Sequence, residues 1–473
     1  MASLAPLLEL INTGIANLQS VEKKNNTPIP NLSQPFHPAS EAFRADPVAA
    51  EAAAHVVAAA LQLVATLSPP VEGLYTLAAA GSFKTAALRV AHESNVTEIL
   101  REAGPQGLHV KDVAQKNGLD EKKLDRILRY LSSTHIYEEV EPNVFRNNRL
   151  SSLLDSGKPS ADVISSPTTK FDGAMGPGAL VAHHLDELTH SAAYTWENLS
   201  DPKTGHSYRS DQCPMSTHLG REINCWDYFC EPGQEFRRHR FDLAMKGMQS
   251  LQPAAAVLDG LEWGKLPKGS TVVDVGGGIG TYMAPLAENF PELKIVVQDL
   301  PKTIQNAHEF WAETNPQAVA EKRVSLEEQS FFDAQPERDV DVFFMKSIIH
   351  DWADSDSKKI LTQLRKAAGK NTKLVLAESI IPYTSRMSEE AADIKGRVPG
   401  SVHKQAPAPL LPNSRSGPMV MTADMVMLIG LAGQERTFDH MQALLLSTGW
   451  KVEEVRHPAS EHVMYSFYVS SPV

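Results

Sequence analysis

A glycine-rich turn is the segment of this sequence best suited to holding a ligand. It reads Asp274-Val-Gly-Gly-Gly-Ile-Gly280 and directly follows an apolar run. Without Cβ atoms, such a turn lets its backbone approach a bound molecule closely. Glycine stands at 276, 278 and 280, but Thr281 takes the place where a G-x-G-x-x-G fingerprint needs its last glycine. Because an acidic residue precedes the first glycine, the pattern favours a zwitterionic amino-acid tail over a pyrophosphate.

Asp299 ends the next apolar run along the chain. A carboxylate about 20 residues beyond a glycine turn can hold two ribose hydroxyls. The plainer interpretation is a helix cap ahead of Pro301. If the glycine turn binds a nucleoside, we expect Asp299 to bind its ribose.

His350 has the clearest capacity for acid–base chemistry. It follows the apolar run DVFFM, at the carboxyl edge where open α/β sheets place their ligands. A histidine of ordinary pKa, about 6.5, can take a proton from a phenol or enol at neutral pH. Taken alone, a histidine before Asp-Trp is more often structural than catalytic, so both interpretations stay open at this point.

Short apolar runs alternate with helical segments beyond residue 270, as between 356 and 368. This alternation predicts a doubly wound parallel α/β sheet. The runs are TVVDV (271–275), KIVVQ (294–298), RVSLE (323–327), DVFFM (341–345) and KLVLA (373–377). Two later stretches, KVEEV (451–455) and VMYSFYV (463–469), are close enough to pair as a hairpin. We therefore assign 251–473 to one domain, with a Pro/Gly/Ser-rich flexible insertion at 384–418.

Residues 1–250 have mainly helical periodicity and form the other predicted domain, with a polar loose arm at 21–45. Gly118 ends one short helix, and Asp120 caps a second with apolar residues at helical spacing. Two β-like pieces around Pro142 follow, which makes a winged-helix unit. Acidic and basic residues are interleaved on the second helix, so a mixed-charge structural face is favoured over a DNA-binding one.

Composition narrows the possible partners. The chain has 473 residues, 42% hydrophobic and 22% charged, and a formal net charge of −12, which disfavours nucleic acid and anionic membranes. The three cysteines form no CxxC pair that would indicate zinc. The start of the chain lacks the basic segment of a signal peptide. The run AAAHVVAAALQLVAT (52–66) is too short to span a bilayer and predicts a buried or dimer-interface helix in a cytoplasmic protein.

Several motifs together resemble the S-adenosylmethionine-dependent O-methyltransferases of the plant caffeate and flavonoid class, which has many fungal members. These motifs are VVDVGGGIG (272–280), VVQDLP (296–301), FFMKSIIHDWAD (343–354), LAESIIP (376–382) and GQERT (433–437). The stretch from 87 to 154 is similar to the family's winged-helix dimerisation domain. The resemblance covers most of residues 70–473. It implies a Rossmann-like methyltransferase sheet preceded by a mainly helical dimerisation domain.

The resemblance also implies roles for particular residues. His350 matches the family's general base, and Glu378 and Glu435 match the carboxylates that flank it. The positions that match S-adenosylmethionine contacts are Gly276, Gly278, Asp299, Ser330, Phe331 and Lys346. Ser330 departs from the family pattern, which usually has an acidic residue there. Met245 and Met427 align with methionines that sandwich an aromatic acceptor.

The function implied is methyl transfer to a phenolic or enolic hydroxyl of a small aromatic or polyketide-like acceptor, in specialised metabolism, by a cytoplasmic homodimer without a metal. A nicotinamide-dependent oxidoreductase would need a complete G-x-G-x-x-G and leaves Asp274 and the HDW segment unexplained. A non-catalytic DNA-binding regulator would be expected to lack an intact base. Binding of reduced nicotinamide, or of duplex DNA at low salt, would favour these two alternatives.

Overall fold

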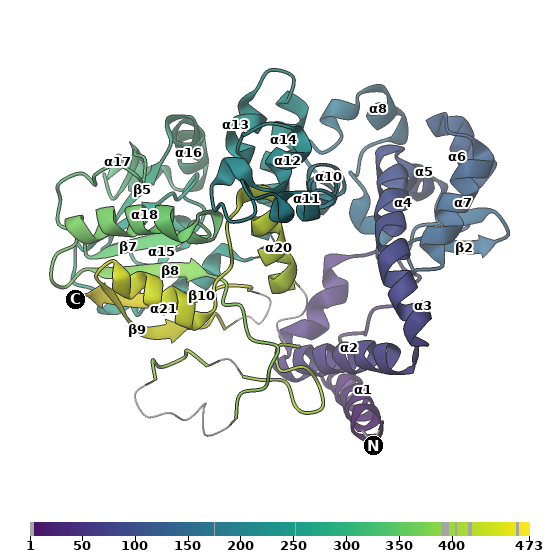
Figure 1. Ribbon diagram of the computed structural model, residues 1–473, viewed down its shortest axis with the longest axis horizontal. Coiled ribbons are helices and arrows are strands. Elements are labelled where there is room, and N and C mark those ends of the chain that lie inside the picture. Colours follow the sequence, from purple (N-terminus) through teal and green to yellow (C-terminus); the bar gives the residue numbers. More distant parts are fainter. Residues whose placement is uncertain are drawn as a thin grey trace. The chain divides into compact units, whose positions relative to one another are not determined.

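We describe the protein from a computed structural model (Figure 1). The structure describes residues 4–174, 176–250, 252–388, 397–402, 404–414, 419–459 and 463–473. The chain forms two compact units. The first comprises Met1–Glu197, Met215–Ser250 and Ala408–Leu410, and the second comprises Asn198–Pro214, Leu251–Pro407 and Leu411–Val473. Residues 198–214 thus belong to the second unit although they precede residue 250.

The second unit is built on a seven-stranded sheet with the order β6-β5-β4-β7-β8-β10-β9. Its strands are β4 (Thr271–Val275), β5 (Lys294–Asp299), β6 (Val324–Glu328), β7 (Val342–Lys346), β8 (Lys373–Glu378), β9 (Trp450–Arg456) and β10 (Ser466–Pro472). The first five pair in parallel, whereas β10 is antiparallel to both β8 and β9. The predicted doubly wound sheet is confirmed, and the two late β stretches form the predicted hairpin.

Alternate residues of each central strand belong to opposite cores. Val272 and Val342 pack with helices α15 (Met283–Asn289) and α16 (Pro301–Thr314) on one face. Val273 and Phe343 pack with α18 (Asp354–Ala367) and α21 (Phe438–Ser447) on the other. Because both faces are covered, these strands are apolar throughout, which is why they could be recognised in the sequence.

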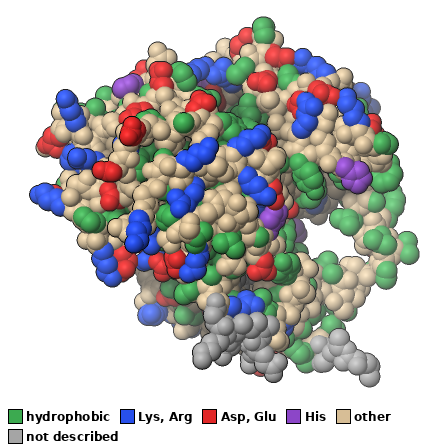
Figure 2. Space-filling model, turned by 60° about the vertical axis from the view of Figure 1, so that its left-hand side comes forward, with side chains coloured by type: hydrophobic (Ala, Val, Ile, Leu, Met, Phe, Trp, Pro, Cys, Tyr) green, Lys and Arg blue, Asp and Glu red, His purple; other side chains and the backbone are tan. Residues whose placement is uncertain are grey.

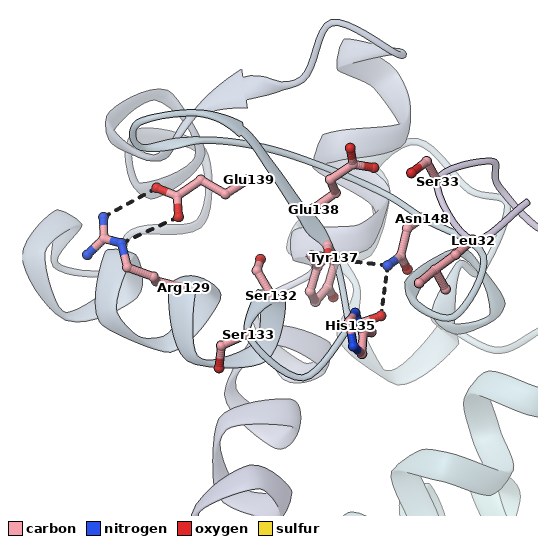
Figure 3. A pocket seen from close by; sticks show the side chains of 10 residues that line it. All are labelled: Leu32, Ser33, Arg129, Ser132, Ser133, His135, Tyr137, Glu138, Glu139 and Asn148. Atoms are coloured by element: carbon pink, nitrogen blue, oxygen red, sulfur yellow. Dashed lines mark hydrogen bonds and ion pairs between the residues drawn. The ribbon is translucent and has the colours of Figure 1, made fainter. Parts of the chain in front are cut away.

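The first unit contains the predicted winged helix. Its parts are α5 (Val96–Ala103), α6 (Val110–Asn117), α7 (Glu121–Ser132) and a sheet of β1 (Leu108–His109), β2 (Glu138–Glu141) and β3 (Val144–Arg146). Asp120 caps α7 by accepting a hydrogen bond from the Lys123 amide, as predicted. A polar pocket of about 400 Å³ lies beside α7 and β2 (Figure 3). The Arg129–Glu139 ion pair forms part of its lining, and none of the predicted site residues does.

Charges of both signs are interleaved on this unit and elsewhere. On α7, Arg129 pairs with Asp125. Lysine, arginine and carboxylate side chains are likewise intermixed on the face that Figure 2 shows. This distribution is typical of a solvated protein surface rather than of a nucleic-acid-binding face.

The prediction of a loose arm at 21–45 is wrong for much of its length. Helix α1 (Ala5–Asn25) includes its beginning and a 3₁₀ helix, Pro38–Ala45, its end. Val21 and Phe43 are buried together against α2 (Pro47–Leu67). The Phe36 amide also donates to the Ser152 hydroxyl at 2.7 Å. Local polarity suggested a loop, but a few apolar residues pin the segment to its neighbours.

Helix α2 is longer than the sequence indicated, because Pro47 starts it and the Asp46 side chain caps it. Its 21 residues have a mean hydropathy of 1.7 in the most apolar window, so its length and composition meet the requirement for crossing a membrane. The prediction that it is too short is therefore wrong. Only 22% of that window is buried within the chain, which also excludes the interpretation of a core helix.

The predicted flexible insertion at 384–418 lies partly outside the described residues, which omit 389–396, 403 and 415–418. Within its described part, residues 397–402 are attached to the sheet's edge. The Val455 amide of β9 donates to the Pro399 carbonyl at 2.8 Å, and Val398 packs on the adjoining core. Residues 397–402 are therefore docked rather than free.

Candidate active site

The predicted cofactor residues lie at or just after the carboxyl ends of β4, β5, β6 and β7. Strands β4 and β7 are neighbours although β5 and β6 come between them in the sequence, and ligands of open α/β sheets bind at such a switch point. Gly276 has φ +69°, and a Cβ there would lie 2.8 Å from the Ile348 side chain. Gly278 has φ +60°, and nothing within 4 Å would meet its Cβ. The turn is thus packed against neighbouring side chains at Gly276 and has free space next to Gly278, which a bound ligand needs.

Asp299 is tied to this turn. Its carboxylate accepts a hydrogen bond from the Gly278 amide at 2.8 Å and another from the Leu300 amide at 2.7 Å. Asp299 is only partly buried, so further oxygen lone pairs remain available at the sheet's edge. This arrangement fits a carboxylate that holds a ribose beside the glycine turn.

Phe331 and Ser330 come after β6. Phe331 reaches the glycine turn, because a Cβ on Gly276 would lie 3.4 Å from its ring. Its ring also packs edge-on against Trp352, with 5.9 Å between centroids. The hydroxyl of Ser330 accepts from the Phe332 amide at 3.3 Å and so shapes the loop. Phe331 thus lies beside the glycine turn, and Ser330 makes a local hydrogen bond; contact of either residue with adenine stays a prediction.

Lys346 ends β7 with its ammonium between two aromatic rings. It lies 4.6 Å from the ring centre of Tyr282 and 5.0 Å from that of Tyr465, within cation–π distance. Burial lowers the pKa of Lys346 to about 8, although Glu378 and Asp274 oppose this shift. Burial, and then the charge of Asp299, raises the pKa of Asp274 to about 8. A cation bound beside Asp274 would favour its ionised form.

We expect the D299N variant to bind S-adenosylmethionine about 10- to 100-fold more weakly, because hydrogen bonds to a charged group contribute roughly 1.5–3 kcal/mol. Isothermal titration calorimetry measures this change directly. The exposed Asp339 provides a matched control, and D339N should bind like the unmodified enzyme. Equal affinity of D299N and D339N would remove Asp299 from the cofactor site.

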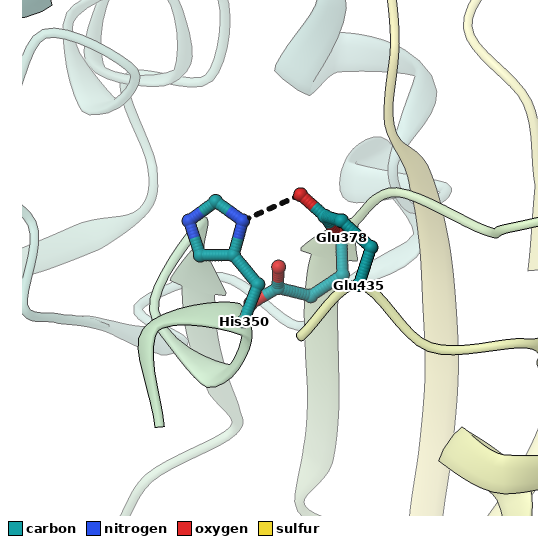
Figure 4. A group of neighbouring side chains, drawn as sticks. All are labelled: His350, Glu378 and Glu435. Carbon is teal, nitrogen blue, oxygen red and sulfur yellow. Dashed lines mark hydrogen bonds and ion pairs between the residues drawn. The ribbon is translucent and has the colours of Figure 1, made fainter. Parts of the chain in front are cut away.

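His350 lies on a short 3₁₀ turn, Ile349–Asp351, after β7. Figure 4 shows its imidazole beside two carboxylates. Nδ1 is 2.7 Å from Oε1 of Glu435, a hydrogen-bonding distance, and the Glu435 side chain is only 2% exposed. In the neutral imidazole, a buried carboxylate on Nδ1 fixes the tautomer whose Nε2 lone pair can accept a proton.

Glu378 makes no hydrogen bond to the imidazole and so does not fix its tautomer, although its charge helps to raise the pKa of His350. Its Oε1 accepts hydrogen bonds from the Ile348 and Ile349 amides at 3.0 and 2.7 Å. Burial, and then the charge of Glu435, raises the pKa of Glu378. Glu378 therefore holds the backbone that carries His350, and of the two predicted carboxylates only Glu435 bonds to the ring.

Asp351, left out of the chemistry by sequence reasoning, lies on the other side of the imidazole. Its Oδ1 is 3.4 Å from Nε2 of His350. Burial raises the pKa of Asp351 to about 6, while the charge of His350 opposes that shift. An acceptor hydroxyl that reaches Nε2 must share this space with Asp351.

Three carboxylates surround His350, and their summed effect exceeds that of burial. Burial by itself lowers the pKa of the imidazole, but Glu435, Asp351 and Glu378 raise it to about 10. The sequence-based expectation of an ordinary pKa is therefore wrong. At neutral pH the imidazole is protonated, and once deprotonated it is a base as strong as a phenolate.

This charge environment predicts that kcat/KM rises about tenfold per pH unit from pH 7 to pH 9 with a simple phenol. At neutral pH the imidazole and a phenol of pKa about 10 are both protonated. Reaction requires that this pair first lose one proton, so the rate rises with pH. Initial rates of product formation across a buffer series check this. A flat profile above pH 7 would contradict the raised pKa of His350.

The segment GQERT (433–437) packs closely against the turn that carries His350. A Cβ on Gly433 would lie 2.3 Å from the His350 carbonyl oxygen, and the Gln434 amide donates to that oxygen at 2.9 Å. Thr437 caps α21 by accepting from the His440 amide. A β-bridge joins Arg436 to Ile380, just beyond β8. Glu435 is thereby set opposite the imidazole.

The predicted acceptor methionines lie in different units. Met245 is on α14 (Glu235–Ser250) of the first unit and packs against a cluster that includes Phe171 and Ala244. Met427 is on α20 (Met419–Leu431) of the second unit and is partly buried. Their joint contact with an acceptor stays a prediction.

Comparisons with known proteins identify the family of the chain. Residues 201–395 match the O-methyltransferase domain family, and residues 76–156 match the O-methyltransferase dimerisation domain. The chain is 42% identical to 4-O-methyltransferase 1 of Phanerochaete chrysosporium over 450 residues, which cover 95% of this chain and 94% of the relative. An O-methyltransferase of Armillaria gallica is 37% identical over 98% of this chain and 97% of its own.

Solved structures share the fold at lower identity. Mitomycin 7-O-methyltransferase MmcR has a TM-score of 0.61 at 21% identity, covering 85% of this chain and 98% of its own. A structure described as a pericyclic reaction enzyme has a TM-score of 0.65 at 15% identity and covers 98% of this chain and 100% of its own. Because one fold carries different chemistries, the identity to the fungal enzymes decides the class. The chain belongs to the O-methyltransferase family and is an S-adenosylmethionine-dependent O-methyltransferase.

Proposed function

We propose that this enzyme methylates a phenolic or enolic hydroxyl of a small aromatic or polyketide-like acceptor in specialised metabolism, with His350 as general base. The contact between His350 Nδ1 and Glu435 Oε1 carries the proposal. It leaves Nε2 as the atom that takes the acceptor's proton. The fungal relatives named as O-methyltransferases support an oxygen acceptor.

The chain's own residues bind, orient and move one proton. Gly276, Gly278, Asp299 and Phe331 would hold S-adenosylmethionine, which supplies a methyl group on a sulfonium when bound. His350 removes the acceptor's proton at Nε2, and Glu435 stabilises the resulting imidazolium through Nδ1. Glu378 keeps the turn in place through the Ile348 and Ile349 amides. Alignment of the acceptor oxygen then supplies most of the remaining rate enhancement.

We infer that the reaction needs no metal. Among the described residues, the one group with metal-ligand potential is His350, Glu378 and Glu435, whose ligand atoms lie within 4.8 Å of one another. Two ligands of one zinc ion, each at about 2.0–2.1 Å in a tetrahedral arrangement, lie roughly 3.4 Å apart. The 2.7 Å between His350 and Glu435 is shorter and suits a hydrogen bond.

We further infer a cytoplasmic homodimer. Helices α2 and α3 (Pro70–Tyr75) share exposed apolar side chains, since Leu61, Val71 and Leu74 are 61–81% exposed. The match to a dimerisation domain supports a second copy of the chain as the partner that covers them. Sedimentation equilibrium would detect the dimer. A monomer that floats with phospholipid vesicles would instead support a membrane role for these helices.

Incubation with methyl-labelled S-adenosylmethionine and a panel of phenols and enols tests the function. Mass spectrometry should find the label on oxygen, with equal rates before and after treatment with a chelator. Label on nitrogen or carbon alone would contradict the acceptor class. Loss of activity with chelator, restored by a divalent metal, would contradict the metal-free reaction.

A further inference from the structure

Arg436 follows Glu435 directly and is 1% exposed, yet the proposed chemistry assigns it no role. Its guanidinium donates from Nη1 to the Ile349 carbonyl at 2.9 Å and from Nη2 to the Trp352 carbonyl at 2.8 Å. These two carbonyls lie on either side of the His350–Asp351 pair. A single side chain therefore holds the backbone before and after the histidine.

The guanidinium is also anchored to a helix. Nε and Nη2 donate to Oδ1 of Asp354, the first residue of α18, at 3.1 and 2.9 Å. Oδ2 of Asp354 lies 2.8 Å from Nε2 of His440, on α21. Gln434 contributes a third contact to Asp354, at 3.2 Å. Arg436 is thus fixed between two helices of one unit and the turn that carries His350.

Burial of an arginine is costly unless its charge and its donors are satisfied. Here the planar guanidinium group of Arg436 donates to two carbonyls and one carboxylate at once. A lysine ammonium cannot do this in the same geometry. The main chain of Arg436 is constrained too, because its carbonyl accepts from the Ile381 amide at 3.0 Å. The position of Glu435, one residue earlier, follows from these restraints.

We propose that Arg436 is a positioning residue for catalysis, which fixes His350 against Glu435 by tying the backbone on both sides of the histidine to Asp354. The inference rests on the proposed role of His350 as base. It extends that role, because the contact of the imidazole with Glu435 joins the Ile349–Asp351 turn to the GQERT segment. The Arg436 side chain makes further hydrogen bonds between the same two segments.

The groups that face the imidazole are Glu435, Asp351 and Glu378. If the two turns separate, the contact with Glu435 weakens first, since it spans them, and the pKa of His350 falls toward its ordinary value. A role in folding alone would lower thermal stability without moving this titration. The pH dependence of His350 therefore distinguishes positioning from general support.

The test compares R436K with R240K in the full-length enzyme. Arg240 is an equally buried arginine of the first unit, 2% exposed and paired with Asp186 and Glu187. We expect R436K to lose about 10- to 100-fold in kcat, as misplacement by an ångström can cost about 10²-fold, with the Kd for S-adenosylmethionine within about twofold. R240K should change thermal stability only.

Carbethoxylation by diethyl pyrocarbonate, followed by mass spectrometry of the His350 peptide, gives a readout independent of turnover. The reagent attacks neutral imidazole, so at pH 7 the His350 of R436K should react about tenfold faster for each unit by which its pKa falls. Carbethoxylation rates over a pH series distinguish a shifted titration midpoint of His350 from a change in the reagent's access to the imidazole. D354N, which removes the anchor, should shift the midpoint in the same direction and serves if R436K fails to fold.

An unchanged kcat and titration midpoint in R436K, or in D354N if R436K does not fold, would overturn the inference, as would an equal shift in R240K. H350A, assayed in parallel, keeps this outcome apart from failure of the proposed function. If H350A retains full turnover, the base assignment itself fails. If H350A is inactive and R436K behaves like the unmodified enzyme, only the role of Arg436 is lost.

Discussion

H350A is expected to turn over about 10²–10⁴-fold more slowly than the unmodified enzyme, the usual contribution of a general base. In the proposed mechanism the imidazole accepts a proton at Nε2, while Nδ1 is hydrogen-bonded to Glu435. Its removal should leave the affinity for S-adenosylmethionine nearly intact, because the residues that fit the cofactor are on the glycine turn and after β5 and β6. Product formation under saturating substrates and calorimetry measure the two effects separately.

H308A is the matched control, since His308 is an exposed histidine on α16. It should turn over at the normal rate. Added imidazole should partly restore H350A if the missing group is a base. Normal turnover in H350A would disprove the assignment, and loss of cofactor affinity in proportion to activity would move His350 into the cofactor site.

E435Q is expected to lose about 10²-fold in kcat on the high-pH plateau and to bring the rise of the pH profile to lower pH, so that the loss is smaller at pH 7. The amide oxygen can still accept from Nδ1, so the geometry is kept while the charge is lost. Without that charge the imidazole becomes a weaker base, since Glu435 is the largest of the effects that raise its pKa. The change is read from kcat and from the midpoint of the pH–rate profile.

E378Q separates the two carboxylates that the sequence could not distinguish. Glu378 contacts the Ile348 and Ile349 amides and not the ring, so E378Q should act mainly by loosening the turn. We expect a smaller displacement of the pH profile than in E435Q, with a larger loss of thermal stability. Equal displacement in both variants would contradict the assignment of Nδ1 to Glu435 alone.

The central strands could be predicted to within one or two residues. Val272–Val275 and Phe343–Met345 are buried on both faces of a parallel sheet, and such strands are continuous apolar runs in sequence. The arm at 21–45 could not be predicted in this way. Its order depends on Phe43 packing against a helix that follows it, a tertiary contact that local polarity does not indicate.

The structure brings three of the predicted site residues together, and their individual contacts could not be predicted. Motif resemblance brought His350, Glu378 and Glu435 together, but it could not show which carboxylate meets Nδ1, since that depends on how two turns are fitted in space. The contacts of Arg436 had no sequence signal of their own, because the two backbone carbonyls and the Asp354 carboxylate meet it only in the folded chain. The raised pKa of His350 likewise depends on three carboxylates that are close only in the folded chain.

The bridge between Ile380 and Arg436 has a consequence for how this enzyme can diversify. Beyond Ile381 the chain turns away from the end of β8, and it comes back beside it at Arg436. The two ends of this excursion are held together there, because the Ile381 amide donates to the Arg436 carbonyl. Glu435 itself lies within this excursion, and its amide donates to Asp424 of α20, so only changes before α20 leave the spacing of His350 and Glu435 unaltered. Replacement of the segment between Ile381 and Met419 should therefore leave the contact between His350 and Glu435 intact.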